Sequence, residues 1–296
     1  MITNLWLDDG LGTTLTLGPL ASGIAFQGID FTPSVRDVSE DRTDGDGSID
    51  STLYAGTGAL TLSLRLFGAT VRATLDHLGH FMSPSLRPYL YIEDSEWATG
   101  RRIQLRPDTA SRPIQVSKGL SRDVALQWKC PNGIWESEVA QTYQFWASLA
   151  ATTGVAVTVA NGVTIDVANG LTMPASSTAA DQTIINAGDA PQPFVAYLYG
   201  PAFGPELVND STGETFRFVP SYSLAAGAYI MLDMQNRKAL LNSDPNSSVL
   251  ANRDFAASTW WRLGPGTSYV RFIADSGSSA STAATLSFRP GYYTGP

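Results

Sequence analysis

The chain has 296 residues, enough for two domains that each bury a hydrophobic core. Charged residues make up 16% of it, against about 25% in an average soluble protein, which fits either a surface covered by partners or a β-rich fold. The formal net charge of −8 and the single cysteine argue against a nucleic-acid partner, a disulfide framework and a Cys-x-x-Cys zinc or redox site.

The N-terminal residues show no targeting signal. The first ten lack the basic stretch of a signal peptide and already contain Asp8 and Asp9. The longest apolar stretch, Leu224 to Leu232, is too short to span a membrane and is interrupted by Gly227. We therefore expect synthesis in a cytoplasm and no membrane insertion.

An alternation with a period of two dominates the first half of the chain and predicts strands. From Ala59 to Phe67, four leucines fall on one face, while Thr61, Ser63 and Arg65 fall on the other. Burial of each leucine contributes about 1.5–3 kcal/mol, so this strand can anchor a sheet. The same alternation predicts strands at 89–94, 101–105, 114–117 and 124–130.

One helix interrupts these strands, from about Thr70 to Met82, and Pro84 ends it. Its apolar stripe is formed by residues spaced four, three and four apart: Val71, Leu75, Leu78 and Met82. A second helical interpretation, for Val139 to Leu149, is ambiguous because Tyr143, Phe145 and Trp146 fit neither period.

The only two histidines, His77 and His80, project away from the apolar stripe of the predicted helix. A zinc site there would need further ligands, of which Asp76 is one candidate. A solvated or subunit-facing helix surface is the favoured interpretation. Cys130 shares its strand face with Val124, Leu126 and Trp128, which predicts a buried structural thiol.

The composition changes at 150–154, and we place the domain boundary between residues 150 and 151. Two Asn-Gly pairs follow, Asn161-Gly162 and Asn169-Gly170, each flanked by alternating β-branched residues. Asn-Gly in this setting is typical of tight hairpins, so the segment predicts a meander. Short strands separated by Gly, Pro and Asn turns continue from Pro193 to the end and indicate a β-sandwich.

The common catalytic motifs are absent from the sequence. The acidic loop 44–50 resembles a calcium loop, but Ile49 and Ala55 stand where an EF-hand needs Gly and a bidentate Glu, so a solvated turn is favoured. Glu93, Asp94 and Glu96 beside Trp97 could supply glycosidase carboxylates, although acids crowd most loops of such a chain. We expect no enzyme, no cofactor and no metal.

The pair Trp260-Trp261 is the most prominent aromatic feature. In an extended segment the two indoles point to opposite sides, so one enters the core and the other could stack on a sugar ring. Packing under a neighbouring loop is favoured over stacking.

The ordered residues of the C-terminal half carry a family resemblance. Pro193 to Pro201 is followed by Asn209, Thr212-Gly213, Leu224 to Asp233 and Leu263 to Gly266. This set resembles the C-terminal domain of the distal tail protein family of long-tailed (siphovirus-type) bacteriophages. The family pattern includes the structural positions Gly200, Pro201, Asn209, Gly213, Gly227, Asp233, Pro265 and Gly266.

The N-terminal half resembles the same family through Gly28 to Arg36, the acidic turn, Tyr54-x-Gly56, the leucine strand and Leu126 to Pro131. Two local departures are Gly58, where a basic residue often stands, and Ser268, where an Asn often stands. The segment 151–183 is either the first strands of the second domain or an insertion.

The resemblance implies a mainly β fold. Residues 1–150 would be an N-terminal β-sandwich-like, tail-tube-like ring domain with one α-helix. Residues 151–296 would be a galectin-like or carbohydrate-binding-module-like β-sandwich.

The resemblance also implies a structural virion component at the tail tip, made in the cytoplasm of the bacterial host. A homo-hexameric ring would join the tail tube protein to the tail-associated tip protein or tape measure, with receptor-binding proteins as further partners.

The alternative function is a glycan-binding adhesion module that contacts the host cell surface, with Trp260 or Trp261 as the stacking residue. No cluster of Asn, Asp or His stands beside the pair in sequence. We therefore predict that the C-terminal domain has no glycan affinity tighter than about millimolar, roughly 4 kcal/mol.

Overall fold

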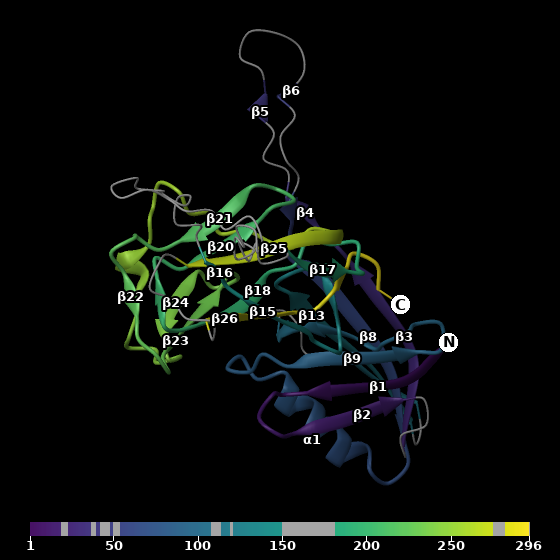
Figure 1. The fold of residues 1–296 in the computed structure, drawn as a ribbon. Helices are drawn as coiled ribbons and strands as arrows, with labels where there is room; N and C mark the ends of the chain where they lie inside the picture. Colours follow the sequence, from purple (N-terminus) through teal and green to yellow (C-terminus); the bar gives the residue numbers. More distant parts are fainter. Residues whose placement is uncertain are drawn as a thin grey trace, which may run out of the picture. The chain divides into compact units, whose positions relative to one another are not determined.

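A computed structural model of the chain is shown in Figure 1. It describes residues 1–18, 23–36, 40–41, 48–49, 54–107, 114–118, 121–149, 181–274 and 282–295. These residues form two compact units, and the first consists of Met1–Val139 together with Arg289–Pro296, while the second consists of Ala140–Phe288.

The first unit contains two antiparallel sheets and two short strand pairs. Its first sheet has the order β2 (Thr14–Gly18), β1 (Ile2–Asp8), β9 (Tyr89–Asp94), β10 (Arg101–Gln104), β14 (Trp135–Ser137), β27 (Gly291–Tyr292). Its second sheet has the order β11 (Arg106–Pro107), β13 (Ser121–Cys130), β8 (Gly58–Phe67), β3 (Ile24–Thr32), with β12 (Ile114–Lys118) also on β13. The short pairs are β4 (Val35–Arg36) with β7 (Tyr54–Ala55), and β5 (Glu40–Asp41) with β6 (Ser48–Ile49).

The leucine strand β8 lies at the centre of the second sheet, and its four leucines are at most 1% exposed. They join one core cluster with Leu126 and Trp128 of β13 and with Leu7 and Leu90 of the first sheet. Because both sheets contribute side chains to this core, the unit is a sandwich. The alternation in the sequence follows from this arrangement, since each strand buries one face.

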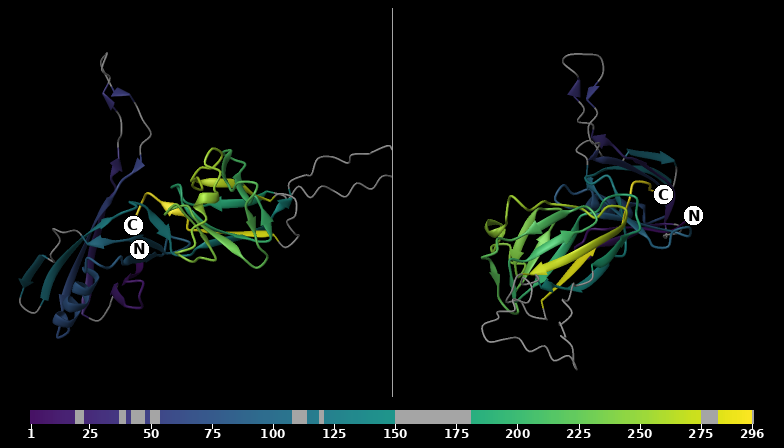
Figure 2. Two further views of the ribbon diagram at one scale, coloured as in Figure 1. Left: turned by 90° about the vertical axis from the view of Figure 1, so that its left-hand side faces the viewer. Right: turned by 45° about the horizontal axis from the view of Figure 1, so that its top comes forward.

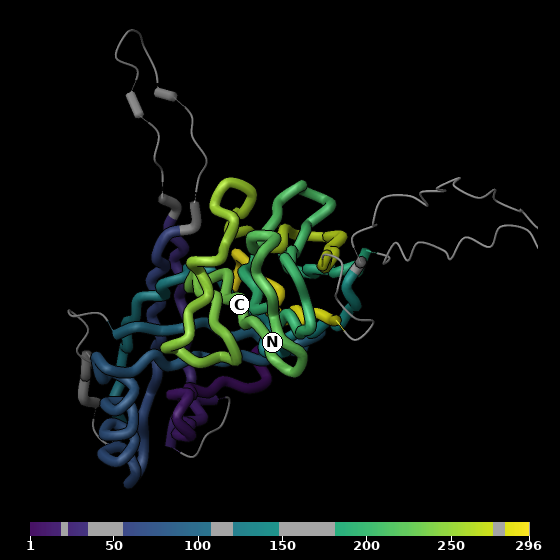
Figure 3. The backbone as a smooth tube through the Cα atoms, turned by 60° about the vertical axis from the view of Figure 1, so that its left-hand side comes forward, coloured from purple at the N-terminus to yellow at the C-terminus, as the bar shows by residue number. Residues whose placement is uncertain are grey.

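The predicted helix is confirmed as α1, Val71–Phe81, which is the blue coil beside the blue strands in Figure 3. Leu78 and Phe81 are fully buried, and Val71, Leu75 and Met82 pack against the same core. No helix among the described residues has the length and apolar character that crossing a bilayer requires.

The second unit is a sandwich of two five-stranded sheets, seen from two further sides in Figure 2. One sheet has the order β15 (Gln141–Trp146), β26 (Ala283–Phe288), β18 (Phe194–Tyr199), β23 (Tyr229–Asp233), β24 (Lys238–Leu241). The other has the order β16 (Ser148–Leu149), β25 (Gly266–Ala274), β20 (Glu206–Asn209), β21 (Glu214–Arg217), with β17 (Gln182–Asn186) also on β25. The short elements are β19 (Ala202–Phe203) paired with β22 (Ser223–Leu224), and a 3-10 turn, η1, at Leu250–Asn252.

The helical interpretation of residues 139–149 is wrong, because these residues form β15 and β16. Phe145 of β15 enters the core of the second unit, while Trp146 points outward and is 58% exposed. Since β15 pairs with β26, the change between units falls after Val139 instead of after residue 150. The acidic turn 44–47 and both Asn-Gly turns lie outside the described residues.

Candidate functional site

His80 is tied to the turn between β1 and β2. Its Nε2 lies 2.9 Å from Oδ2 of Asp9, whose side chain is only 2% exposed. The other carboxylate oxygen accepts the backbone N–H groups of Leu11 and Thr13. The bond from His80, together with these backbone donors, holds the pKa of Asp9 well below its usual range. The pair therefore fixes α1 to the sheet, a contact that the sequence does not suggest because 71 residues separate the partners.

Two candidate reactive groups of the first unit, Cys130 and Asp94, are buried or paired. Cys130 is fully buried, as predicted, and burial raises the pKa of its thiol to about 12. Asp94 accepts a 2.7 Å bond from the N-terminal amino group, which lowers its pKa. Among the described residues, no three His, Cys, Asp or Glu side chains are grouped as metal ligands.

An aromatic–arginine surface, formed by Trp6, Tyr89, Tyr91, Arg102 and Glu136, covers the outer face of the first sheet. The register aligns Trp6, Tyr91, Arg102 and Glu136 in one row across four strands. The rings of Trp6 and Tyr91 stack at 5.0 Å, and the guanidinium carbon of Arg102 lies 4.3 Å from the centre of Tyr89. Arg102 also forms a 3.0 Å ion pair with Glu136. The charge of Arg102 is therefore neutralised by Glu136 within this surface.

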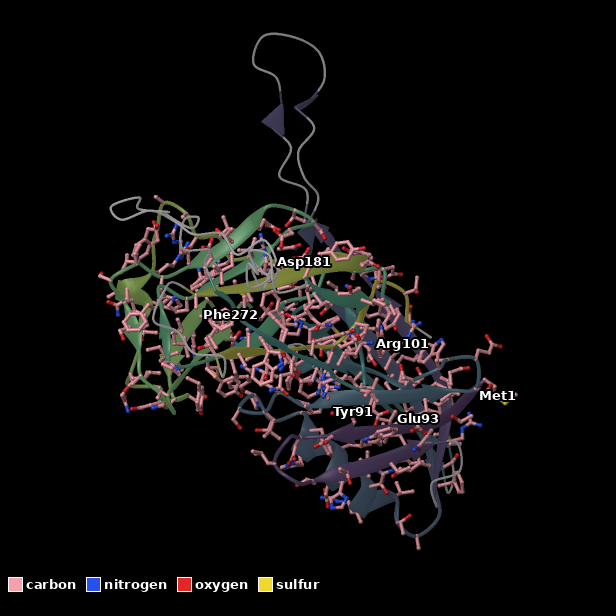
Figure 4. All side chains as sticks on the ribbon, in the orientation of Figure 1. Met1, Tyr91, Glu93, Arg101, Asp181 and Phe272 are labelled. Carbon is pink, nitrogen blue, oxygen red and sulfur yellow. The ribbon has the colours of Figure 1, made fainter. Side chains whose placement is uncertain are left out.

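Arg101, the neighbouring arginine, holds the C-terminal strand in place. Its guanidinium carbon lies 4.1 Å from the ring centre of Trp97 and 4.0 Å from that of Tyr292. Its Nη1 donates to the carbonyl oxygen of Thr294 at 2.7 Å. Figure 4 labels Arg101, Tyr91 and Glu93 on this unit. Trp97 therefore serves as a stacking partner within the protein.

The outer face of the second sheet of the first unit has a different chemistry. Between the buried leucines, β8 presents Thr61 and Ser63 outward, opposite Gln127 and Ala125 of β13. A charged pair at one end of this face joins Arg65 and Asp123, at 2.6 Å. With Asp30 of β3 opposite Thr61, the middle of this face is polar and carries few large side chains.

Trp260 and Trp261 both make packing contacts within the second unit. Trp261 is 1% exposed, and its ring lies 4.5 Å from that of Phe194 in the core. Trp260 is partly buried, with the ring of Phe216 at 4.6 Å and the guanidinium carbon of Arg253 at 5.3 Å. Both indoles therefore have packing roles within the unit.

The family-pattern residues Gly213, Gly227, Gly266 and Asp233 lie at turns that join strands. The three glycines have positive φ angles of 75°, 78° and 86°, a region that side chains disfavour. Asp233 accepts hydrogen bonds from the backbone N–H and the amide of Asn236 and so closes the β23–β24 turn. The backbone geometry of these turns therefore explains why glycine and aspartate occupy these positions.

The other family-pattern residues shape close packing. A side chain at Gly200 would collide with the carbonyl oxygen of Ala225, and the bond from Gly200 to Pro201 is cis. Asn209 is fully buried, and its backbone oxygen and Oδ1 accept bonds from the following turn. Pro265 immediately precedes β25. These positions therefore contribute close packing and turn hydrogen bonds to the second sandwich.

The family comparison concerns the second unit and the strand that follows it. Residues 187–292 match the family model described as the siphovirus-type tail component, C-terminal domain. This segment is therefore similar to the C-terminal domain of siphovirus-type tail components. Comparison with curated proteins gives no match.

Solved phage structures align with nearly the whole length of the chain. The crystal structure of SPP1 Dit, described as a paradigm of the hub adsorption apparatus in Gram-positive-infecting phages, matches with a TM-score of 0.62 at 13% identity. The alignment covers 97% of this chain and 98% of that one. Two structures of the phage P2 baseplate in its activated conformation, with Ca and with Sr, match with a TM-score of 0.50 at 10% identity. Each alignment covers at least 97% of both chains. The resemblance to distal tail proteins and the mainly β fold predicted from the sequence are confirmed.

Proposed function

We propose that this siphovirus tail component forms a ring-shaped hub that joins the tail tube to the host-recognition apparatus at the tail tip. The observation that carries the proposal is the match of residues 187–292 to the tail-component domain, within a chain whose alignment to SPP1 Dit covers 97% of its length. A structural role also fits the side chains, because the Cys130 thiol is buried and the carboxylate of Asp9 is bonded to His80 within the fold.

A homo-hexameric ring needs two different surfaces on each subunit that fit each other and close. The first unit offers such a pair in its second sheet. This sheet ends at β3 on one side and at β11 and β12 on the other, so its two edges differ in sequence and length. Unpaired strand edges are natural sites for pairing between chains. We therefore assign the contacts within the ring to this sheet.

The two ring faces would then meet different tail proteins. One would contact the tail tube protein, and the other the tip protein or tape measure, with receptor-binding proteins attached at the periphery. The second unit would project outward, as a galectin-like or carbohydrate-binding-module-like sandwich. Residues 1–150 and 151–296 were predicted as the domains, and we propose that each of the two compact units folds on its own core.

Native mass measures the hub proposal directly. We expect mass photometry of the full chain, alone or mixed with its tail tube and tip partners, to show a closed hexamer. Negative-stain images of that species should show a sixfold ring. A monomer at micromolar concentration both with and without the partners would overturn the hub, whereas a monomer only before assembly is consistent with it.

A further inference from the structure

The sheet β15-β26-β18-β23-β24 has a row of aromatic side chains on its outer face. The register places Trp146 opposite Ala283, Ala283 opposite Tyr199, and Tyr199 opposite Tyr229. Trp146 is 58% exposed and Tyr199 is 36% exposed. The rings of Tyr199 and Tyr229 lie 5.8 Å apart. We call this row, together with Tyr197 behind it, the tyrosine face.

Neutral polar groups follow in the next rows of the same sheet. Gln144 lies opposite Thr285, which lies opposite Tyr197, and the ring of Tyr197 is 5.7 Å from that of Tyr229. In the following row, Thr142 donates a hydrogen bond to Ser287. Among the described residues, the hydroxyls of Tyr197, Tyr199 and Tyr229 and the Nε1 of Trp146 have no hydrogen-bond partner, so they remain available to a ligand.

The outer face of the opposite sheet in the same unit differs from the tyrosine face. There Arg271 pairs with Asp210 at 2.6 Å and lies 3.7 Å from Asp181, and Arg217 lies 3.8 Å from Glu206. Its exposed tyrosine, Tyr269, lies opposite Thr183. Figure 4 labels Asp181, which directly precedes β17, and Phe272, a buried residue of β25. The opposite face thus carries ion pairs that satisfy each other, beside the exposed side chains of Tyr269 and Ile185.

We propose that the tyrosine face is a binding site for a neutral saccharide. A pyranose has apolar C–H faces and a rim of hydroxyl groups, so it needs aromatic rings to stack on and neutral donors and acceptors beside them. Trp146 and Tyr199 supply the rings, on strands two spacings apart, which is about 10 Å. Ala283 between them is only 4% exposed, so a ligand would rest on the two rings and not on the strand between them.

A neutral saccharide fits this face better than an apolar protein partner or an anionic ligand. The rows beside the aromatics combine Met231 and Val195 with Gln144, Thr285 and the Thr142–Ser287 pair. These neutral donors and acceptors suit the hydroxyl rim of a sugar. The only charged residues in these rows, Asp233 and Lys238, lie opposite each other, so the face attracts neither charge. The site is distinct from the Trp260–Trp261 pair, which is packed within the unit.

A shallow, open sheet face binds weakly, so we expect a dissociation constant in the millimolar range for one site, about 4 kcal/mol of binding free energy. Several copies in one ring would raise the avidity, since further sites then bind at a high effective concentration. This gain rests on the proposed hub function, whereas the site itself does not.

Affinity electrophoresis of the full chain tests the proposal. Native gels would contain one of a panel of soluble neutral polysaccharides: a β-glucan, a galactomannan, a xyloglucan or the neutral wall polysaccharide of a Gram-positive bacterium. We expect at least one to retard the protein. Trp146→Ala and Tyr199→Ala should each weaken the retardation at least tenfold, measured as the polysaccharide concentration for half-maximal effect. Tyr199→Phe keeps the ring and should lose less.

Tyr269→Ala is the matched control, because Tyr269 is an exposed tyrosine on the opposite sheet of the same sandwich. It should migrate like the unchanged protein, and the melting temperatures of all variants would confirm that they are folded. The proposal is overturned if no polysaccharide retards the unchanged chain, or if the Trp146 and Tyr199 variants are retarded as strongly as the control. If these variants instead lose binding to a tail partner, the face is a protein interface. A monomeric native mass with intact retardation would overturn the hub alone.

Discussion

The two units use aromatic side chains on their outer sheet faces in opposite ways. In the first unit Trp6, Tyr89 and Tyr91 are stacked with each other and with Arg102, which is itself paired with Glu136. In the second unit Tyr199 and Tyr229 contact other rings, and no cation–π pair within the described residues involves them. In the first surface the rings and the charged groups are paired with each other. In the second, the tyrosine hydroxyls are donors without a partner among the described residues. This difference assigns rigidity to one surface and recognition to the other.

This comparison requires that each unit has its own hydrophobic core. Removing a large side chain from either core should have the largest effect on stability. Trp128 is 1% exposed in the first unit, and Trp261 is 1% exposed in the second. Replacing either with Ala removes a buried indole, which costs about 3–5 kcal/mol. We expect calorimetry to show two unfolding transitions, with Trp128→Ala lowering one and Trp261→Ala lowering the other. If both variants shift a single common transition equally, the units do not fold separately.

Substitution of Arg102 tests how much it stabilises the aromatic–arginine surface of the first unit. Arg102 is 17% exposed at its side chain, and Arg102→Leu would leave Glu136 partly buried without its partner. We expect a loss of about 1–3 kcal/mol in the free energy of unfolding of the first unit, measured by urea denaturation.

The exposed Arg262, whose Nη2 lies 3.3 Å from Gln235, is the matched control in the second unit. Arg262→Leu should change stability by no more than about 0.5 kcal/mol. Equal effects of the two substitutions would show that the surface around Arg102 is no more rigid than an ordinary one.

Acid should affect the first unit more than the second. The lowered pKa of Asp9 means that below pH about 4 the unfolded chain binds a proton at this carboxyl while the folded chain does not. The stabilisation is complete above that pH and decreases as the pH falls toward the lowered pKa. We expect Asp9→Asn to make the melting temperature of the first unit less dependent on pH between pH 4 and pH 2.

Asp244 in the second unit is the matched control for Asp9. Its pKa is also lowered, by the backbone N–H of Asn246 and the hydroxyl of Ser247, but its turn is exposed. Asp244→Asn should change the pH dependence less than Asp9→Asn does. A larger change for the Asp244 variant would mean that the buried carboxylate is not the main acid-sensitive group.

Elements with a clear local period could be predicted from the sequence. Contacts that depend on which residues pair between strands could not. Strand β8 and helix α1 were predicted because one face of each is uniformly apolar. Strand β15 was missed because Phe145 and Trp146 make both of its faces apolar, which matches neither period. The tyrosine face could not be predicted, since Trp146 and Tyr199 come together only through their common partner Ala283. The contact of Asp9 with His80 likewise exists only in the folded chain.

The smallest expected changes in stability come from replacing one glycine in each unit with alanine. Gly79 lies in α1 with open space where a Cβ would project, so Gly79→Ala should stabilise the first unit by about 0.5–1 kcal/mol through helix propensity. Gly227 also has open space, but its φ of 78° strains any side chain, so Gly227→Ala should destabilise the second unit by about 1 kcal/mol. Because neither position meets a steric clash, opposite signs in the two melting temperatures would isolate backbone conformation as the cause. Equal signs would show that the two glycines differ less in backbone strain than their φ angles indicate.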